Sequence, residues 1–132
     1  MLVLVSLVFV SVASSAQWNE FRGPQGEGHT DAKLPMEVTA QGHVWKTPMP
    51  GKAWSSPVVW DNQIWFTNAE ADGHKLWAVC LNAKTGKVIW THSYPAPLID
   101  YLHEGGPCST PTVDGSTVYA LSKHGVLHAY GA

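Results

Sequence analysis

The feature of this sequence that most limits its fold is an internal repeat. Placing Pro57 over Pro111 aligns SSPVVWDNQIWFT with CSTPTVDGSTVYALS at an offset of 54 residues. Placing Trp45 over Trp90 aligns VWKTPMP with IWTHSYP at an offset of 45, and the difference of nine reflects the longer loop PAPLIDYLHEGG in the second copy. A repeat of this length predicts that similar structural units follow one another along the chain.

Short strand-like runs alternate with turn residues from residue 44 onward. The runs are rich in Val, Ile, Thr and aromatic residues, which favour strands. They read VWKTP, SSPVVW, QIWFTN, KLWAVCLN, KVIWTHS, STPTV, TVYALS and VLHAY. The turn pairs Asp61-Asn62, Asp72-Gly73 and Asp114-Gly115 separate them at hairpin spacing. The pattern therefore predicts an all-β chain built from successive antiparallel hairpins.

Four-stranded antiparallel units that recur every ~40 to 50 residues are typical of β-propeller blades. Residues 55–93 supply one complete blade, residues 44–48 an N-terminal closing strand, and Ala132 falls within a partial second blade. A ring of four to eight blades needs roughly 160 to 360 residues. We therefore expect residues 44–132 to form part of a β-propeller, which can have any of these blade numbers. A chance run of hairpins from a β-sandwich is the alternative.

The first 43 residues lack this pattern. Residues 2–12 form a largely apolar run of eleven, and the small residues of 13–16 follow it. This profile predicts a signal peptide over residues 1–16, with a buried strand or a misplaced start codon as the alternative. Residues 17–43 contain repeated Gly and Pro and read as an extended N-terminal arm. We expect an exported protein, periplasmic or extracellular, without a membrane span after signal removal.

Charge narrows the range of partners. The net charge is −2, and only 14% of the residues are charged. The sequence has no basic stripe of the kind that holds a nucleic-acid backbone. Nucleic acid is therefore not an expected partner.

One segment carries a family resemblance. CLNAKTGKVIW, residues 80–90, resembles the eleven-residue tryptophan-docking motif of quinoprotein (PQQ-dependent) propellers. Gly86 and Trp90 match that motif, whereas Cys80 replaces its usual Ala and Asn82 its usual Asp. The resemblance implies that the glycine permits a tight turn between the third and fourth strands. It also implies that the Trp ring packs flat between neighbouring blades.

The opening WNEFRGP and the segment VWKTPMPGKAWSSPVVW are also similar to the start of exported PQQ-like repeat proteins of unassigned chemistry. If the full protein were a quinoprotein dehydrogenase, the resemblance would imply PQQ on the propeller axis, a calcium ion and a catalytic Asp. The adjacent Cys pair found in many such enzymes has no counterpart, because 27 residues separate Cys80 from Cys108. We assign no catalytic residue and expect no cofactor in this chain.

The two cysteines and their neighbours leave two further possibilities. Oxidising compartments permit a disulfide between Cys80 and Cys108, but two small buried residues are the favoured reading, and the pairing stays open. His103, Glu104 and Cys108 form HEGGPC, which matches no zinc-ligand spacing. No metal site is predicted. The other histidines are interpreted as surface or turn residues.

The long loop over residues 94–107 is the candidate binding surface, because loops on a rigid scaffold often carry binding residues. It presents Tyr101, His103 and Glu104. The alternative is a connecting loop without a binding role. The sequence thus predicts a propeller scaffold that binds a protein or a small ligand at one face. The rival hypotheses are the N-terminal part of a PQQ-dependent oxidoreductase, and a sensor or assembly factor. Calcium-ligand carboxylates and a catalytic Asp downstream would distinguish the oxidoreductase.

Overall fold

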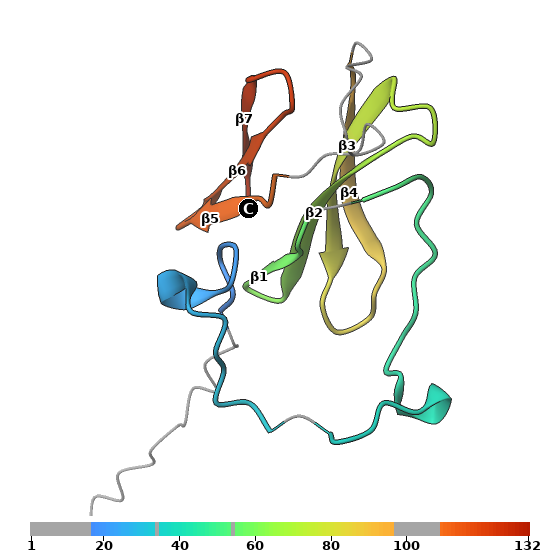
Figure 1. The fold of residues 1–132 in the computed structure, drawn as a ribbon, viewed down its shortest axis with the longest axis vertical. Helices are drawn as coiled ribbons and strands as arrows, with labels where there is room; N and C mark the ends of the chain where they lie inside the picture. The colour runs from blue at the N-terminus through green and yellow to red at the C-terminus, as the bar shows by residue number, and fades with distance from the viewer. Residues whose placement is uncertain (1–16, 34, 54, 97–108) are drawn as a thin grey trace, which may run out of the picture.

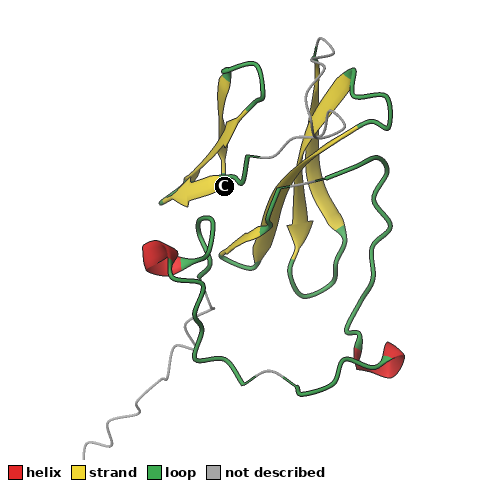
Figure 2. Cartoon of the chain, viewed as in Figure 1, coloured by secondary structure: helices red, strands yellow, loops and turns green. Residues whose placement is uncertain are grey.

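The computed structural model describes residues 17–33, 35–53, 55–96 and 109–132, and these residues form an all-β structure (Figures 1 and 2). The prediction of an all-β chain of antiparallel hairpins is confirmed. Two short 3-10 helices, η1 (Pro24–Gly26) and η2 (Ala40–Gly42), interrupt the N-terminal arm. Within the described part of the chain, no helix has the length and hydropathy needed to cross a bilayer. The predicted signal peptide lies outside the described residues.

The first sheet is a four-stranded antiparallel meander in which each strand pairs with the next along the chain. Its strands are β1 (Val58–Trp60), β2 (Gln63–Ala69), β3 (Lys75–Asn82) and β4 (Val88–Pro95). Asp61 and Asn62 both have positive φ, 42° and 66°, as the two-residue turns that match strand twist require. Residues 55–93, predicted as one four-stranded unit, therefore lie almost entirely in this sheet.

The second sheet repeats the first three strands of the first. Its strands are β5 (Thr112–Asp114), β6 (Thr117–Leu121) and β7 (Leu127–Gly131), again in a meander. Val58 pairs with Trp65 in the first sheet, and Thr112 pairs with Tyr119 in the second. Both residues of the second pair lie 54 positions after their counterparts. The sequence repeat is therefore also a repeat of strand register.

The prediction of an N-terminal closing strand is wrong, because residues 44–48 do not form a strand. Exposed and half-buried side chains alternate along the segment, but no main-chain hydrogen bond joins it to a described strand. Side chains hold it instead. Trp45 Nε1 donates a hydrogen bond of 2.9 Å to the Ala83 carbonyl, and Thr47 Oγ1 donates one of 2.6 Å to the Gly86 carbonyl. The segment therefore lies against the β3–β4 turn rather than beside a strand edge.

Each sheet has two faces, which we name by the repeat. The front face of the first sheet carries Val58, Trp65 and Cys80, which are paired across its strands; the equivalent residues of the second sheet are Thr112, Tyr119 and Ala129. The back face of the first sheet carries Val59, Ile64 and Leu81; the equivalents in the second sheet are Val113, Val118 and Tyr130.

The main core lies between the two sheets. Val58, Trp65 and Cys80 from the front face of the first sheet cluster with Val113 and Val118 from the back face of the second. All five side chains are buried. The sheets therefore stack front on back, which is the arrangement of successive units that keep the same orientation. Two sheets stacked front on front would bring Trp65 and Tyr119 together instead.

The start of the N-terminal arm joins the two sheets at their first strands (Figure 1). Trp18 and Val59 of β1 exchange two main-chain hydrogen bonds of 2.8 Å, and the Val113 amide of β5 donates to the Asn19 carbonyl at 2.8 Å. Arm residues far away in sequence thus satisfy main-chain groups along the exposed edges of β1 and β5. The arm therefore links the first strands of the two sheets.

Candidate functional site

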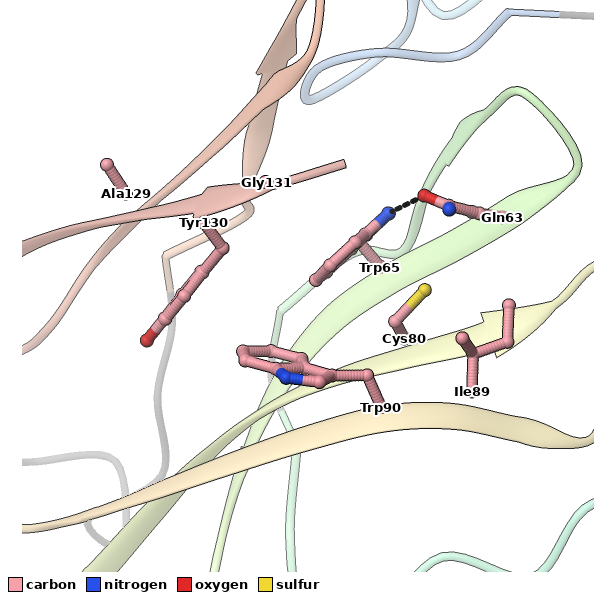
Figure 3. Close-up of a pocket in the computed structure, with 8 residues that line it drawn as sticks. All are labelled: Gln63, Trp65, Cys80, Ile89, Trp90, Ala129, Tyr130 and Gly131. Carbon is pink, nitrogen blue, oxygen red and sulfur yellow. Dashed lines mark hydrogen bonds between the residues drawn. The ribbon is translucent and has the colours of Figure 1, made fainter.

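A cleft of about 400 Å³ opens between the two sheets, beside the core (Figure 3). Strands β2, β3 and β4 form one wall, and β7 of the second sheet forms the other. The lining residues are Gln63, Trp65, Cys80, Ile89, Trp90, Ala129, Tyr130 and Gly131. The cleft exists because the front face of one sheet meets the back face of the next at their outer strands.

Three aromatic rings dominate the walls of the cleft. The centroids of Trp65 and Trp90 lie 5.6 Å apart with 54° between the ring planes, and those of Trp90 and Tyr130 lie 5.0 Å apart at 61°. Tilted and edge-to-face arrangements of this kind suit the charge distribution of aromatic rings. Trp65 Nε1 also donates a hydrogen bond of 2.8 Å to Gln63 Oε1. Trp90 therefore contacts both sheets at once, in the position where the docking motif expects an inter-unit ring.

A β-bulge increases the apolar surface of the cleft. Cys80 pairs with Trp90, but the adjacent Leu81 pairs with Val88, which leaves Ile89 as an extra residue in β4. A bulge places two neighbouring side chains on one face of a strand. Ile89 and Trp90 accordingly both line the cleft.

The cleft carries no charge at neutral pH. Burial raises the pKa of the Cys80 thiol to about 11, so that this thiol stays protonated and is a poor nucleophile. Burial also raises the pKa of the Tyr130 phenol. No other lining residue is ionisable. The site is therefore suited to packing or to binding a neutral, flat group, and it offers no acid–base pair.

The aromatic surface continues beyond the cleft as a row of rings between β4 and β7. His92 stacks on Trp90 at 5.9 Å, and Tyr94 stacks on His128 at 4.2 Å. Burial, with a smaller effect from the Tyr130 phenol, raises the pKa of Tyr94 to about 12. His92 is exposed, as the interpretation of a surface residue predicts, but His92 and His128 lie in strands and contact aromatic rings. Because alternate residues of a strand share a face, the spacing of Trp90, His92 and Tyr94 could have revealed this row.

The docking-motif residues occupy the end of β3, the β3–β4 turn and β4. Asn82 Oδ1 accepts hydrogen bonds from the Lys84 and Thr85 amides at 3.0 Å and from Thr85 Oγ1 at 3.1 Å, which stabilises the turn. Gly86 has φ of 67°, and a Cβ there would overlap the Trp45 ring. A glycine is thus required twice at this position, for its backbone conformation and for the close approach of the ring.

The cleft does not fit PQQ, and the described residues offer no metal-ligand group for the calcium ion of quinoprotein dehydrogenases. PQQ carries several carboxylates, which need cationic or hydrogen-bond-donating partners, and the cleft has no cation. Calcium takes about six to eight oxygen ligands, and within the described ranges no group of three or more His, Cys, Asp or Glu side chains could hold a metal ion. No reaction step is derived through either group.

Two sequence predictions concern residues outside the described part of the chain. The candidate binding residues Tyr101, His103 and Glu104 lie outside the described residues, as does Cys108. Cys80, for its part, is a buried free thiol.

Comparison with known proteins does not assign the chain to a family. No family model matches the sequence, and no curated protein matches it.

Proposed function

We propose that the two sheets are adjacent blades of an exported β-propeller with quinoprotein-type repeats, which serves as a scaffold for binding a protein or a small ligand. The observation that carries this proposal is the front-on-back stacking of two sheets with the same strand order. Head-to-tail contacts between identical units form a ring when their rotation closes. A β-sandwich that pairs the same face of its two sheets would not repeat in this way.

The environment of Trp45 gives independent support. Trp45 aligns with Trp90 in the sequence repeat, and its ring lies against Gly86, the turn glycine of the docking motif. The resemblance implies this kind of contact between a Trp of one blade and its neighbour. Residues 44–48 therefore take the place, beside the first sheet, that the fourth strand of a neighbouring blade would take.

The chemistry of the cleft favours binding over catalysis in this part of the protein. Its walls are aromatic and uncharged, and its one thiol is protonated at neutral pH. A PQQ-dependent oxidoreductase remains the second candidate, supported by the docking motif alone. In that case the residues that hold the quinone and calcium would come from other blades.

Substitution of Trp90 tests the stacked arrangement. Trp90→Ala removes a ring that contacts Trp65 of its own sheet and Tyr130 of the next, so we expect a loss of about 3 kcal/mol in the free energy of unfolding. Urea unfolding followed by circular dichroism measures it. Val38→Ala, at a side chain that is 77% exposed, is the control and should leave the midpoint unchanged. An unchanged midpoint for Trp90→Ala would contradict the stacking.

Binding and cofactor tests separate the two functions. The chain is immobilised and exposed to the exported proteins of its source, beside a Tyr101→Ala/His103→Ala/Glu104→Ala variant and a control variant with the exposed arm residues His29, Asp31 and Lys33 changed to Ala. A scaffold retains a partner that the loop variant loses by about tenfold or more and the control keeps. Saturable binding of PQQ at micromolar concentration would instead favour the oxidoreductase.

A further inference from the structure

The N-terminal arm binds both sheets immediately after the predicted signal peptide. Trp18 uses its amide and its carbonyl in two hydrogen bonds of 2.8 Å with Val59 of β1. The next residue, Asn19, accepts a bond of 2.8 Å from the Val113 amide, and its side chain donates one of 3.3 Å to the Val113 carbonyl. The first residue paired with a strand is therefore only the second residue after position 16, where the predicted signal peptide ends.

Side chains hold the same segment in place. Gln17 Nε2 donates a hydrogen bond of 3.2 Å to Asp61 Oδ1 in the β1–β2 turn. Gly23 has φ of 72° and lies so close to the Trp18 ring that a Cβ would be 2.6 Å from a ring atom. The arm is therefore docked over residues 17–23 by main-chain pairing and by close packing.

Removal of a signal peptide needs this segment in a different place. The small residues before position 17 suit a signal peptidase, which adds water across the 16–17 peptide bond and leaves a free α-amine on Gln17. The peptidase has to enclose the chain on both sides of that bond, in the space that β1 fills beside Trp18. Each backbone amide is also a single donor, so the Trp18 amide cannot serve Val59 and a peptidase at the same time.

We propose that docking of the arm and removal of the signal peptide exclude each other, so that the signal peptide must be removed before the arm joins β1 to β5. A chain that folds first would keep its apolar run of residues 2–12. The chain therefore crosses its membrane unfolded and is processed before its two sheets are linked. This inference rests on the export that is part of the proposed function.

Two glycines of the arm provide a matched pair for the test. Gly23 and Gly26 both have positive φ, 72° and 69°, so that alanine costs a similar strain at either position. Only the methyl group at position 23 would meet the Trp18 ring, because a Cβ at position 26 would have no described atom within 4 Å. Gly23→Ala should therefore release the arm, whereas Gly26→Ala should leave it docked.

Cleavage is measured on the 132-residue chain in non-ionic detergent with purified signal peptidase, and mass spectrometry records the loss of residues 1–16. Each protein is either folded beforehand or diluted from urea directly into the peptidase. The folded wild type should be cleaved at least about tenfold more slowly than the diluted sample, because only the undocked fraction is a substrate. Folded Gly23→Ala should be cleaved at least about tenfold faster than the folded wild type, and folded Gly26→Ala at the rate of the wild type.

A globally unfolded variant would also be cleaved quickly, so circular dichroism must show that Gly23→Ala keeps the strand signal of the wild type. If it does not, Asp61→Gly replaces it. Glycine suits the positive φ of 42° at this position, and the substitution removes the hydrogen bond to Gln17. Folded Asp61→Gly should be cleaved at least about twofold faster than the folded wild type.

The proposal is wrong if the folded and the diluted wild type are cleaved at the same rate, or if Gly23→Ala and Gly26→Ala change the rate equally. Either result leaves the export in the proposed function standing. A diluted wild type that is not cleaved after residue 16 refutes the predicted signal peptide, and the inference fails with it. The stacking of the two sheets is tested separately by Trp90→Ala.

Discussion

The two sheets share a strand order and a register, yet they differ in how they are covered. In the first sheet, front-face Trp65 is 3% exposed and back-face Val79 is 1% exposed, because the second sheet and residues 48–50 lie on opposite sides of it. In the second sheet, back-face Val118 is 1% exposed, whereas front-face Tyr119 is 38% exposed. Repeat-equivalent positions thus have different burial. Neighbouring units, rather than strand sequence, decide which positions form the core.

The largest effect expected from this difference is at the equivalent positions 65 and 119. Trp65→Ala should cost about 3 to 5 kcal/mol, because it removes a buried ring from the core between the sheets. Tyr119→Ala should cost less than about 1 kcal/mol, since its side chain is partly exposed. Urea unfolding followed by tryptophan fluorescence, at a concentration where the chain is monomeric, compares the two. Equal losses would mean that both faces of the second sheet are covered in solution.

Turn glycines give a smaller contrast between the sheets. Gly86→Ala should cost about 2 to 4 kcal/mol, because φ of 67° is unfavourable for Ala and the new methyl group would meet the Trp45 ring. Gly125 in the β6–β7 turn has φ of 77°, but a methyl group added there would have no described atom within 4 Å. Gly125→Ala should therefore cost only about 1 kcal/mol. Thermal unfolding of the two variants compares the losses in stability. A similar loss in both would show that the contact with the Trp45 ring does not add to the cost at position 86.

The smallest effect concerns alkaline pH and again separates equivalent positions, Cys80 and Ala129. The folded thiol has a pKa of about 11 against 9.0 for an unperturbed one, so the unfolded chain ionises first as the pH rises. Stability should therefore fall as the pH rises through 9 towards 11, and the loss between about pH 8 and about pH 10 should be about 1 kcal/mol. Cys80→Ala, which installs the residue found at position 129, should flatten that decline. Urea midpoints at about pH 8 and about pH 10, on either side of the unperturbed thiol pKa, measure it. An identical decline in both proteins would assign it to Tyr94 and Tyr130.

Local pattern predicts most of the strands but not their environment. The offset of 54 and the turn pairs locate the strands of both sheets to within a few residues, because hairpin turns and period-two alternation are local properties. The same reasoning predicts a strand over residues 44–48. Their main chain has no strand partner, since Trp45 and Thr47 bind the β3–β4 turn instead. Alternation reports one covered face and says nothing about a strand edge.

The candidate site depends on long-range packing and is only partly visible in the sequence. The docking motif identifies Trp90 as a ring between units, but it does not identify the neighbours Trp65 and Tyr130. Tyr130 lies 40 residues after Trp90, and nothing in local spacing links two strands of different sheets. The spacing of Trp90, His92 and Tyr94 places their rings on one face of a strand, but nothing local shows that His128 of the other sheet stacks on Tyr94.

Strand order, hairpin turns, the repeat and the glycine at position 86 can be predicted from the residues alone, because each follows from main-chain sterics or side-chain alternation within a few residues. Packing between distant segments sets which face of each sheet is buried, which rings line the cleft and where the N-terminal arm joins β1 to β5. Those features depend on contacts between segments as far apart as Asn19 and Val113. Their energies come from surface removed from water when distant units meet, and no local pattern encodes that meeting.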